Sequence, residues 1–176
     1  QRCYSLALDL LNDIYLGRYQ PEHFLPSPSK IGEEKQVSVT TVRRTLTLLG
    51  HLGATRSING VGTQALSPAD SSQNCDLSQP VIQKRLLDFA QSLQILALTC
   101  GASLEITLDA MDAMAIQWWR NRLLALKENG RYESVVFDSL EVIPHFSPIR
   151  AVREIYRQLL RILIWGYPLR SLHGSR

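Results

Sequence analysis

Apolar residues recur three and four positions apart along most of the chain, which is the spacing of amphipathic helices. In the first third of the chain this pattern predicts helices over residues 5–15, 28–35 and 38–50. The apolar positions of the first and third helices are Leu6, Leu10, Ile14, Val42, Leu46 and Leu49. Ser27 is a typical N-cap, and Pro28 suits the first position of the second helix because its missing N–H has no helical partner there.

The third helix follows the second after a break at Gln36-Val37, so the two are expected to form a helix-turn-helix. Ser38 is the expected N-cap of the third helix. Hydroxyls bond phosphate oxygens, and an arginine binds guanine edges or phosphates through two parallel hydrogen bonds. The polar face of this helix carries both kinds of group, on Thr40, Thr41, Arg43, Arg44 and Thr47. It therefore suits a helix that lies in the major groove of DNA.

Two short strand-like runs follow, over residues 54–58 and 63–66. The residues between them, Asn59-Gly60-Val61-Gly62, carry a strong turn signal, so a hairpin is expected as the wing of the helix-turn-helix. Glycines allow a backbone to approach a phosphate chain or a minor groove closely. The candidate contacts in the wing are Arg56, Asn59, Gly60 and Gly62.

Residues 67–79 are polar and rich in helix breakers, which predicts a linker between one domain at 1–66 and another at 80–176. The second domain shows only helical spacing. Its expected helices cover 80–99, with Gly101 as the stop, then 104–127, 132–142 and 148–165. The predicted fold class is mainly α: an N-terminal winged helix-turn-helix with a small β-hairpin wing, and an all-α C-terminal helical-bundle domain.

Composition narrows the function only slightly. A chain of 176 residues, 45% hydrophobic and 20% charged, is typical of a globular protein. The formal net charge is +3, and residues 1–66 hold seven Lys or Arg against five Asp or Glu, so charge alone does not indicate nucleic acid. Cys3, Cys75 and Cys100 are widely spaced, which predicts neither a disulfide framework nor a zinc site and fits a reducing cytoplasm.

No apolar run approaches the ~20 residues of a membrane-spanning helix, and the N-terminus lacks a basic-then-apolar signal sequence. A soluble cytoplasmic protein without a membrane partner is therefore expected. Because the chain opens with Gln1 rather than methionine, we expect it to be part of a longer protein. The sequence has no nucleophile elbow, phosphate-binding glycine loop or carboxylate pair, so neither an enzyme nor a cofactor is predicted.

The run from Ile14 to Leu66 resembles, without a gap, the winged helix-turn-helix of GntR-type bacterial transcription regulators. The matching positions are Gly17, Tyr19, Pro21, Leu25-Pro26-Ser27, Val37-Ser38, Thr41-Val42-Arg43, Leu46, Leu49, Gly53, Gly60 and Gly62-Thr63. The resemblance implies that this part of the chain binds duplex DNA. Together with the wing residues above, the candidate DNA contacts are Ser27, Lys30, Ser38, Thr40, Thr41, Arg43 and Arg44.

The chain departs from this family in the helix-turn-helix itself. It has Pro28-Ser29 where the family usually has Glu-Arg, and Val39 where the family usually has Arg, so two customary DNA-contacting arginines are missing. Of the customary arginines only Arg43 stands at a matching contact position, with the cations at positions 30 and 44 nearby. Fewer charge-assisted contacts predict weaker and less salt-dependent DNA binding. Gln36 stands where the family favours glycine, which bears on the geometry of the turn.

The helical part resembles, more distantly, the effector and dimerisation domain of the FadR-like branch of this family. Lys84-Arg85-Leu86-Leu87-Asp88 is similar to its opening motif, and Phe137-Asp138 falls where the branch often has Phe-His. Because Asp138 replaces that histidine, and the later histidine-bearing helices are not in this sequence, no metal site is carried over. The resemblance implies a homodimer and leaves a small-molecule effector open.

Several signals have simpler explanations. A solvated helix face explains Arg43 and Arg44 when they are taken alone, but inside an ordered winged-helix match we favour DNA contact. Trp118-Trp119 are interpreted as core and dimer packing rather than as a ligand-stacking site. His145, four residues after Glu141, has no third metal ligand and is interpreted as a surface or capping histidine. A solvated face is also preferred for the arginines of the last helix, Arg150, Arg153, Arg157 and Arg161.

The sequence therefore predicts a DNA-binding transcription regulator, a dimeric repressor whose two recognition helices enter successive major grooves of a roughly palindromic operator. The alternative is a winged-helix module that has lost sequence-specific DNA binding and serves protein–protein assembly. The two missing arginines motivate this alternative.

Overall fold

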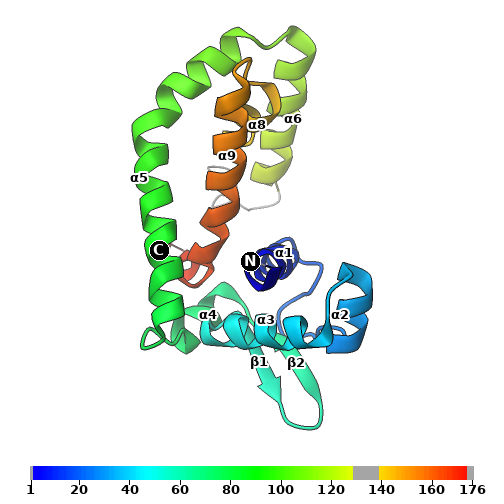
Figure 1. Ribbon diagram of the computed structural model, residues 1–176. Coiled ribbons are helices and arrows are strands. Elements are labelled where there is room, and N and C mark those ends of the chain that lie inside the picture. Colours follow the sequence, from blue (N-terminus) through cyan, green and yellow to red (C-terminus); the bar gives the residue numbers. More distant parts are fainter. Residues whose placement is uncertain (1, 129–138, 174–176) are drawn as a thin grey trace. The chain divides into compact units, whose positions relative to one another are not determined.

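The computed structural model describes residues 2–128 and 139–173. The chain forms two compact units, one from Gln1–Phe89 with Ile164–Arg176 and the other from Ala90–Leu163. Helix α5 (Pro80–Asp109) contributes to both units (Figure 1). These units do not coincide with the predicted domains at 1–66 and 80–176. The assignment of DNA binding to the first domain and of dimerisation to the second stays a prediction.

The first unit contains the predicted winged helix-turn-helix. Its elements before α5 are α1 (Arg2–Tyr15), α2 (Pro28–Lys35), α3 (Val39–His51), β1 (Thr55–Ile58), β2 (Gly62–Ala65) and α4 (Pro68–Asn74). Figure 1 shows α1 on one side of α3 and the β1–β2 hairpin projecting on the other. The apolar stripes predicted from the sequence meet in the core between these helices, where the fully buried side chains include Leu10, Leu11, Ile31, Val42, Leu49 and Leu52. The predicted mainly helical fold with a winged helix-turn-helix is confirmed.

The wing is a two-stranded antiparallel sheet with Arg56 opposite Gln64 and Ile58 opposite Gly62. The segment before α2 lies along its second strand. The N–H of Leu25 donates to the carbonyl of Thr63 at 2.8 Å, and Phe24 forms an isolated bridge with Gln64. This pairing fixes the base of the wing to the rest of the unit.

Helix α4 occupies most of the segment that the sequence predicts to be a linker. Ser67 caps it by accepting a hydrogen bond from the N–H of Asp70 at 3.1 Å. The buried hydroxyl of Ser71 donates to the carbonyl of Leu52 at 3.0 Å. Gly53, which has φ of +77°, lies so close to α4 that a Cβ there would sit 2.5 Å from the carbonyl oxygen of Ser71. The composition of this segment therefore did not predict that it contains a packed helix. Serine and proline suit the start of a short helix as well as a loop.

The C-terminal 3₁₀ segment η1 (Leu163–His173) returns to the first unit from Ile164 onward. Trp165 and Tyr167 are each about 1% exposed. A Cβ at Gly166 would collide with the ring of Phe89, so the segment packs against the start of α5 at a position that only glycine fits.

The second unit comprises the rest of α5 with α6 (Ala113–Glu128), α8 (Val142–Phe146) and α9 (Arg150–Ile162). Thr99 and Tyr156 share a hydroxyl–hydroxyl hydrogen bond of 2.8 Å, which joins α5 to α9. On the other side, the ring of Trp118 in α6 packs edge-on against Phe146 of α8, with 5.8 Å between ring centroids. Figure 1 accordingly shows α8 and α9 between α5 and α6.

The helix boundaries of this unit differ from the sequence prediction. Gly101 does not end a helix: α5 continues through it to Asp109, and Gly101 is absent from the glycines with positive φ that a helix stop of this kind requires. The break comes at Asp112, whose carboxylate accepts a hydrogen bond from the N–H of Ala115 at 2.8 Å and caps α6. The helix predicted over 148–165 ends at Ile162 and continues as η1. The helix predicted over 132–142 falls mostly on residues 129–138, outside the described residues.

Helix α5 is long and apolar enough, by length and composition alone, to cross a membrane. An 18-residue window has mean hydropathy 1.2, and 11% of that window is buried. Polar residues such as Ser92 and Gln94 interrupt its apolar positions, so the sequence shows no unbroken apolar run of this length. One such helix is weak evidence for a membrane span, because the core helix of a soluble protein has the same length and composition.

Candidate nucleic-acid interface

The helix-turn-helix begins with a capped α2. The hydroxyl of Ser27 accepts a hydrogen bond from the N–H of Lys30 at 3.3 Å, and Pro28 occupies the first turn, as the sequence predicts. The side chain of Lys30 is exposed on the outer face of this helix. The hydroxyl of Ser27 thus accepts a hydrogen bond within the helix end, while the ammonium of Lys30 remains at the surface.

The turn between α2 and α3 forms although it lacks the glycine usual in the resembling family. Gln36 adopts the left-handed conformation, with φ of 52° and ψ of 46°, and its N–H donates to the carbonyl of Glu33 at 3.3 Å. The N–H of Val37 donates to the carbonyl of Gly32 at 2.9 Å. These bonds satisfy carbonyls at the end of α2, so they hold Gln36 in a conformation that costs an L-residue about 1 kcal/mol.

The recognition helix α3 buries one face and exposes the other. Ser38 caps it, since its hydroxyl accepts a hydrogen bond from the N–H of Thr41 at 3.2 Å. Val42, Leu46 and Leu49 are buried, as predicted, and Thr45 is also fully buried, with its hydroxyl donating to the carbonyl of Thr41 at 2.9 Å. The exposed face carries Thr40, Arg43, Arg44 and Thr47.

The guanidinium groups of Arg43 and Arg44 are free to bind a partner. Within residues 2–128 and 139–173, neither forms an ion pair or a hydrogen bond. Lys35 is different, because its ammonium lies 3.2 Å from the carboxylate of Asp13. The cations at the helix-turn-helix therefore divide into a structural one, Lys35, and three exposed ones, Lys30 on α2 and Arg43 and Arg44 on α3.

The wing presents its turn to solvent. Gly60 has φ of +74°, which favours glycine, and the N–H of Val61 donates to the carbonyl of Ile58 at 3.1 Å to close the turn. Arg56 and Asn59 are exposed, and Val61 is 65% exposed at the tip. The tip thus presents the side-chain amide of Asn59 and the apolar side chain of Val61. The cation of the hairpin is Arg56, on β1.

The structure brings the predicted contact residues to the surface in three groups. Ser27 and Lys30 lie at the start of α2, and Ser38, Thr40, Thr41, Arg43 and Arg44 lie on or just before α3. Arg56, Asn59, Gly60 and Gly62 lie on the hairpin. All are exposed except Thr41, which is half-buried. Their contact with DNA stays a prediction.

A buried carboxylate holds α1 to α2. Asp13 lies on α1 and is only 5% exposed. Its carboxylate lies 2.8 Å from Arg18 and 3.2 Å from Lys35. Burial, and next the negative charge of Asp13, raise the pKa of the nearby Tyr19 hydroxyl. Helical spacing cannot reveal such a site, because both of its cationic partners lie outside α1.

The candidates in the second unit are explained by local packing. The Nδ1 atom of His145 lies 2.7 Å from the carbonyl oxygen of Glu141, and no group of three potential metal ligands occurs among the described residues. Arg153 donates to the carbonyl of Ser147 at 2.6 Å, and Arg157 to that of Pro144 at 3.2 Å. These two arginines thus hold the end of α8 in place, a role beyond the solvated face that we favoured from the sequence.

The turn, the exposed face of α3 and the hairpin occur together in one unit, so this unit is a winged helix-turn-helix, the class of domain that presents a helix to DNA. Residues 5–64 match the sequence model of a family described as bacterial regulatory proteins, gntR family. Residues 5–64 thus form a winged helix-turn-helix of the GntR type, a domain of DNA-binding transcription regulators.

Two solved structures are similar to the chain. Streptococcus agalactiae GntR is 15% identical, with 96% of this chain and 82% of that chain covered and a TM-score of 0.39. A transcriptional regulator (GntR family member) from Pseudomonas syringae pv. tomato str. DC3000 is 12% identical, with 99% and 69% covered and a TM-score of 0.37. The curated proteins gave no match. The similarity to the GntR family rests on the match to residues 5–64.

Proposed function

We propose that the protein is a homodimeric repressor that binds a roughly palindromic operator in the cytoplasm. The observation that carries this proposal is the exposed face of α3, where Arg43 and Arg44 have free guanidinium groups beside the hydroxyls of Thr40 and Thr47. This face enters the major groove, Arg43 binds a base edge or a phosphate, and the wing follows the adjacent backbone.

The second unit supports the dimer. Leu98 on α5 is 86% exposed and Met114 on α6 is 83% exposed. Other large apolar side chains of this unit that are exposed include Leu93, Ile95, Ile106, Ile116, Trp118 and Leu124. An apolar surface of this kind is typical of a protein-binding site, and a second copy of the unit would cover it through a self-complementary contact.

The departures from the family predict the strength of DNA binding. Val39 stands at the first position of α3 and Ser29 lies in the first turn of α2, where arginines would add charge-assisted contacts. We therefore expect selective binding with few phosphate contacts and a shallow dependence on salt.

The first experiment is a fluorescence-anisotropy titration of the whole chain with random duplexes and with duplexes selected from a random pool, across a series of salt concentrations. Salt-sensitive binding with selectivity for a palindrome supports the proposal. No binding even at low salt contradicts it and favours the assembly module. The same titration therefore separates the two classes of function.

The dimer is tested on Leu98. Replacing Leu98 by glutamate puts a charge on the proposed contact surface, so sedimentation equilibrium should show monomers where the unchanged chain shows dimers. Gln158→Glu is the matched control, because it adds the same charge at an exposed polar position on α9. If both variants stay dimeric, the dimer contact lies elsewhere. If the unchanged chain is monomeric, the homodimer proposal fails.

A further inference from the structure

The recognition helix α3 begins with an apolar side chain on its exposed face. Val39 is the first residue of the helix and is half-buried. Arg43, which is exposed, follows four residues later, so the two side chains lie on the same face. In a helix-turn-helix the N-terminal residues of the recognition helix are the ones that contact base edges in the major groove. Val39 therefore stands where a base is read.

The polar groups beside Val39 do not provide paired hydrogen bonds to a base. The Ser38 hydroxyl accepts a hydrogen bond from the N–H of Thr41 at 3.2 Å and lies 2.9 Å from the Thr41 hydroxyl. Arginine and lysine bind guanine edges through two hydrogen bonds, and asparagine and glutamine bind adenine edges in this way. None of these four residue types occurs from Val37 to Val42. The first turn of α3 thus offers apolar contact.

An open hollow of about 520 Å³ lies beside Val39, between α2 and the start of α3. Val37, Val39 and Gly32 line it with carbon and backbone atoms, and its other lining residues are Ser29, Glu33, Gln36 and Ser38. No lysine or arginine of the described residues lines this hollow, and the carboxylate of Glu33 disfavours a phosphate group there. The hollow therefore suits an uncharged, apolar group of the DNA.

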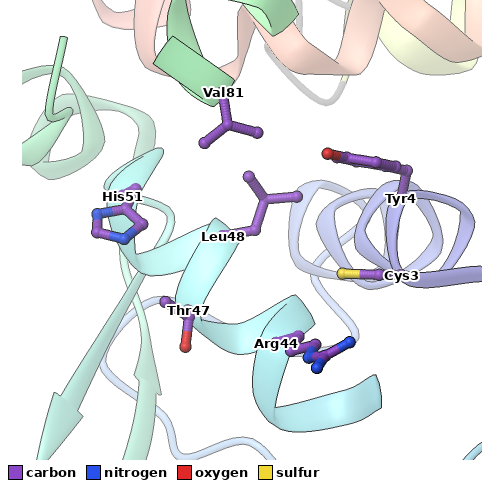
Figure 2. A pocket seen from close by; sticks show the side chains of 7 residues that line it. All are labelled: Cys3, Tyr4, Arg44, Thr47, Leu48, His51 and Val81. Carbon is purple, nitrogen blue, oxygen red and sulfur yellow. The ribbon is translucent and has the colours of Figure 1, made fainter. Parts of the chain in front are cut away.

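The cations of α3 stand one turn further along the helix. Figure 2 shows Arg44 at the edge of a separate pocket, lined by side chains of α1, α3 and α5, with its guanidinium directed away from Val81. Arg43 lines neither this pocket nor the hollow between α2 and α3. Both guanidinium groups are thus available to phosphates or to a guanine edge, which leaves the apolar contact to the first turn.

We propose that Val39 reads thymine. Its methyl groups pack against the C5-methyl group of a thymine that faces the hollow between α2 and α3, so each half-site of the operator contains a thymine at this position. Among the bases, thymine is the one that presents an apolar group in the major groove, whereas cytosine presents an amino donor. The inference rests on the proposed function, because it names the base that α3 recognises.

The test uses the whole chain and a duplex selected from a random pool. Each thymine is replaced in turn by uracil, which keeps the Watson–Crick pair and lacks only the C5-methyl group. Fluorescence anisotropy should show one thymine in each half-site at which uracil weakens binding about fourfold, the effect of one buried methyl group. At the same position, 5-methylcytosine should bind about fourfold more tightly than cytosine. If no uracil replacement weakens binding, the proposal is overturned.

Variants of Val39 assign this effect to its side chain. Val39→Ala removes both methyl groups and should bind the thymine and uracil duplexes equally. Val39→Thr replaces one methyl group by a hydroxyl, and it should reduce the difference should the alanine variant not fold. Val61→Ala is the matched control, because it makes the same change at a valine that is 65% exposed in the wing, and it should keep the fourfold difference.

The variants also contain the results that overturn the assignment. If Val39→Ala keeps the difference between thymine and uracil, another residue reads the methyl group. If Val61→Ala loses the difference as fully as Val39→Ala does, the methyl group acts through the shape of the DNA and not through contact with Val39. The uracil series with the unchanged chain needs no variant, so it tests the thymine contact independently of folding.

Failure of the thymine contact and failure of the proposed function give different results. If the chain binds a selected duplex and no uracil replacement weakens binding, the thymine contact is wrong and the repressor proposal stands. If no duplex binds even at low salt, the proposed function fails and the thymine contact fails with it.

Discussion

The phenolic hydroxyl of Tyr167 donates a 2.6 Å hydrogen bond to the backbone carbonyl of Leu66, and both residues are buried. The bond joins the C-terminal segment η1 to the end of the wing, which lies 101 residues earlier in the chain. The first unit is therefore completed by residues from the far end of the sequence.

Removing this hydroxyl should destabilise the first unit. Tyr167→Phe leaves a buried carbonyl without this donor, so the free energy of unfolding should fall by about 1–2 kcal/mol in urea titrations. Tyr4→Phe is the control, because it removes the same group from a side chain that is 39% exposed, and it should change stability little. Equal effects of the two replacements would contradict the structural role of the Tyr167 hydroxyl.

The packing of α4 on the helix-turn-helix is tested by two glycines with nearly equal φ angles. Gly53 and Gly60 have φ of +77° and +74°, but only at Gly53 would an added Cβ have neighbours within 4 Å, the nearest at 2.5 Å. Gly60→Ala should therefore lower the free energy of unfolding by about 1 kcal/mol, from backbone strain alone. Gly53→Ala should lower it by about 3 kcal/mol or more, because strain and overlap with α4 add. Similar losses in chemical denaturation would show that α4 does not pack there.

The left-handed Gln36 predicts a stabilising replacement. Gln36→Gly should raise the free energy of unfolding by about 0.5–1 kcal/mol, because glycine adopts φ of this sign without steric strain. Glu34→Gly, inside α2, is the control with the opposite expected sign and a loss of about 1 kcal/mol. Thermal unfolding of the two variants measures both. A loss of stability in Gln36→Gly would mean that the glutamine side chain contributes more than the strain costs.

The helix-turn-helix and its wing could be predicted because their signals are local. Ser27, Ser38 and the Asn59-Gly60 turn each act on backbone groups within a few residues of themselves, so a single sequence reveals them. The same reasoning failed at Gly101, since a glycine inside a long helix costs only about 1 kcal/mol and need not end it.

The remaining features depend on partners outside the element in which each residue lies. The burial of Asp13 depends on Arg18 and Lys35, which lie outside α1, and the packing of η1 depends on Leu66 and Phe89. The pocket beside α3 needs side chains from α1, α3 and α5 together. Helical periodicity names the residues on each helix but does not state which helices meet, so these features appear only in the structure.

Acid should weaken the turn that precedes α5, at Asp76. Hydrogen bonds from the Ser78 hydroxyl and from Gln79, and then the Ser78 N–H, hold the pKa of this carboxyl below its ordinary value of 3.8. A lowered folded pKa means that the carboxylate contributes stability above pH 3.8, which is lost as the pH falls through the lowered pKa. Asp76→Asn should therefore be less stable than the unchanged chain at neutral pH, and this difference should shrink in strong acid.

Ser78→Ala provides the matched test of the Asp76 carboxylate. It removes the hydroxyl donor, while the N–H of residue 78 and the acid itself remain. Urea titrations at several pH values should show a smaller pH dependence than in the unchanged chain. A stability difference between Asp76→Asn and the unchanged chain that does not vary with pH would contradict the lowered pKa.

The exposed face of α3 gives the sharpest functional prediction. Arg43→Ala should lower DNA affinity by roughly ten- to a hundredfold, and if Arg43 binds a phosphate the slope of log affinity against log salt should fall by about 1. Val39→Arg restores the arginine that the family usually has and should raise both affinity and slope. Arg150→Ala removes the same charge from an exposed position on α9 and should leave both unchanged. If Arg43→Ala and Arg150→Ala have equal effects, the response is one of net charge rather than of contact, and α3 does not enter the groove through this face.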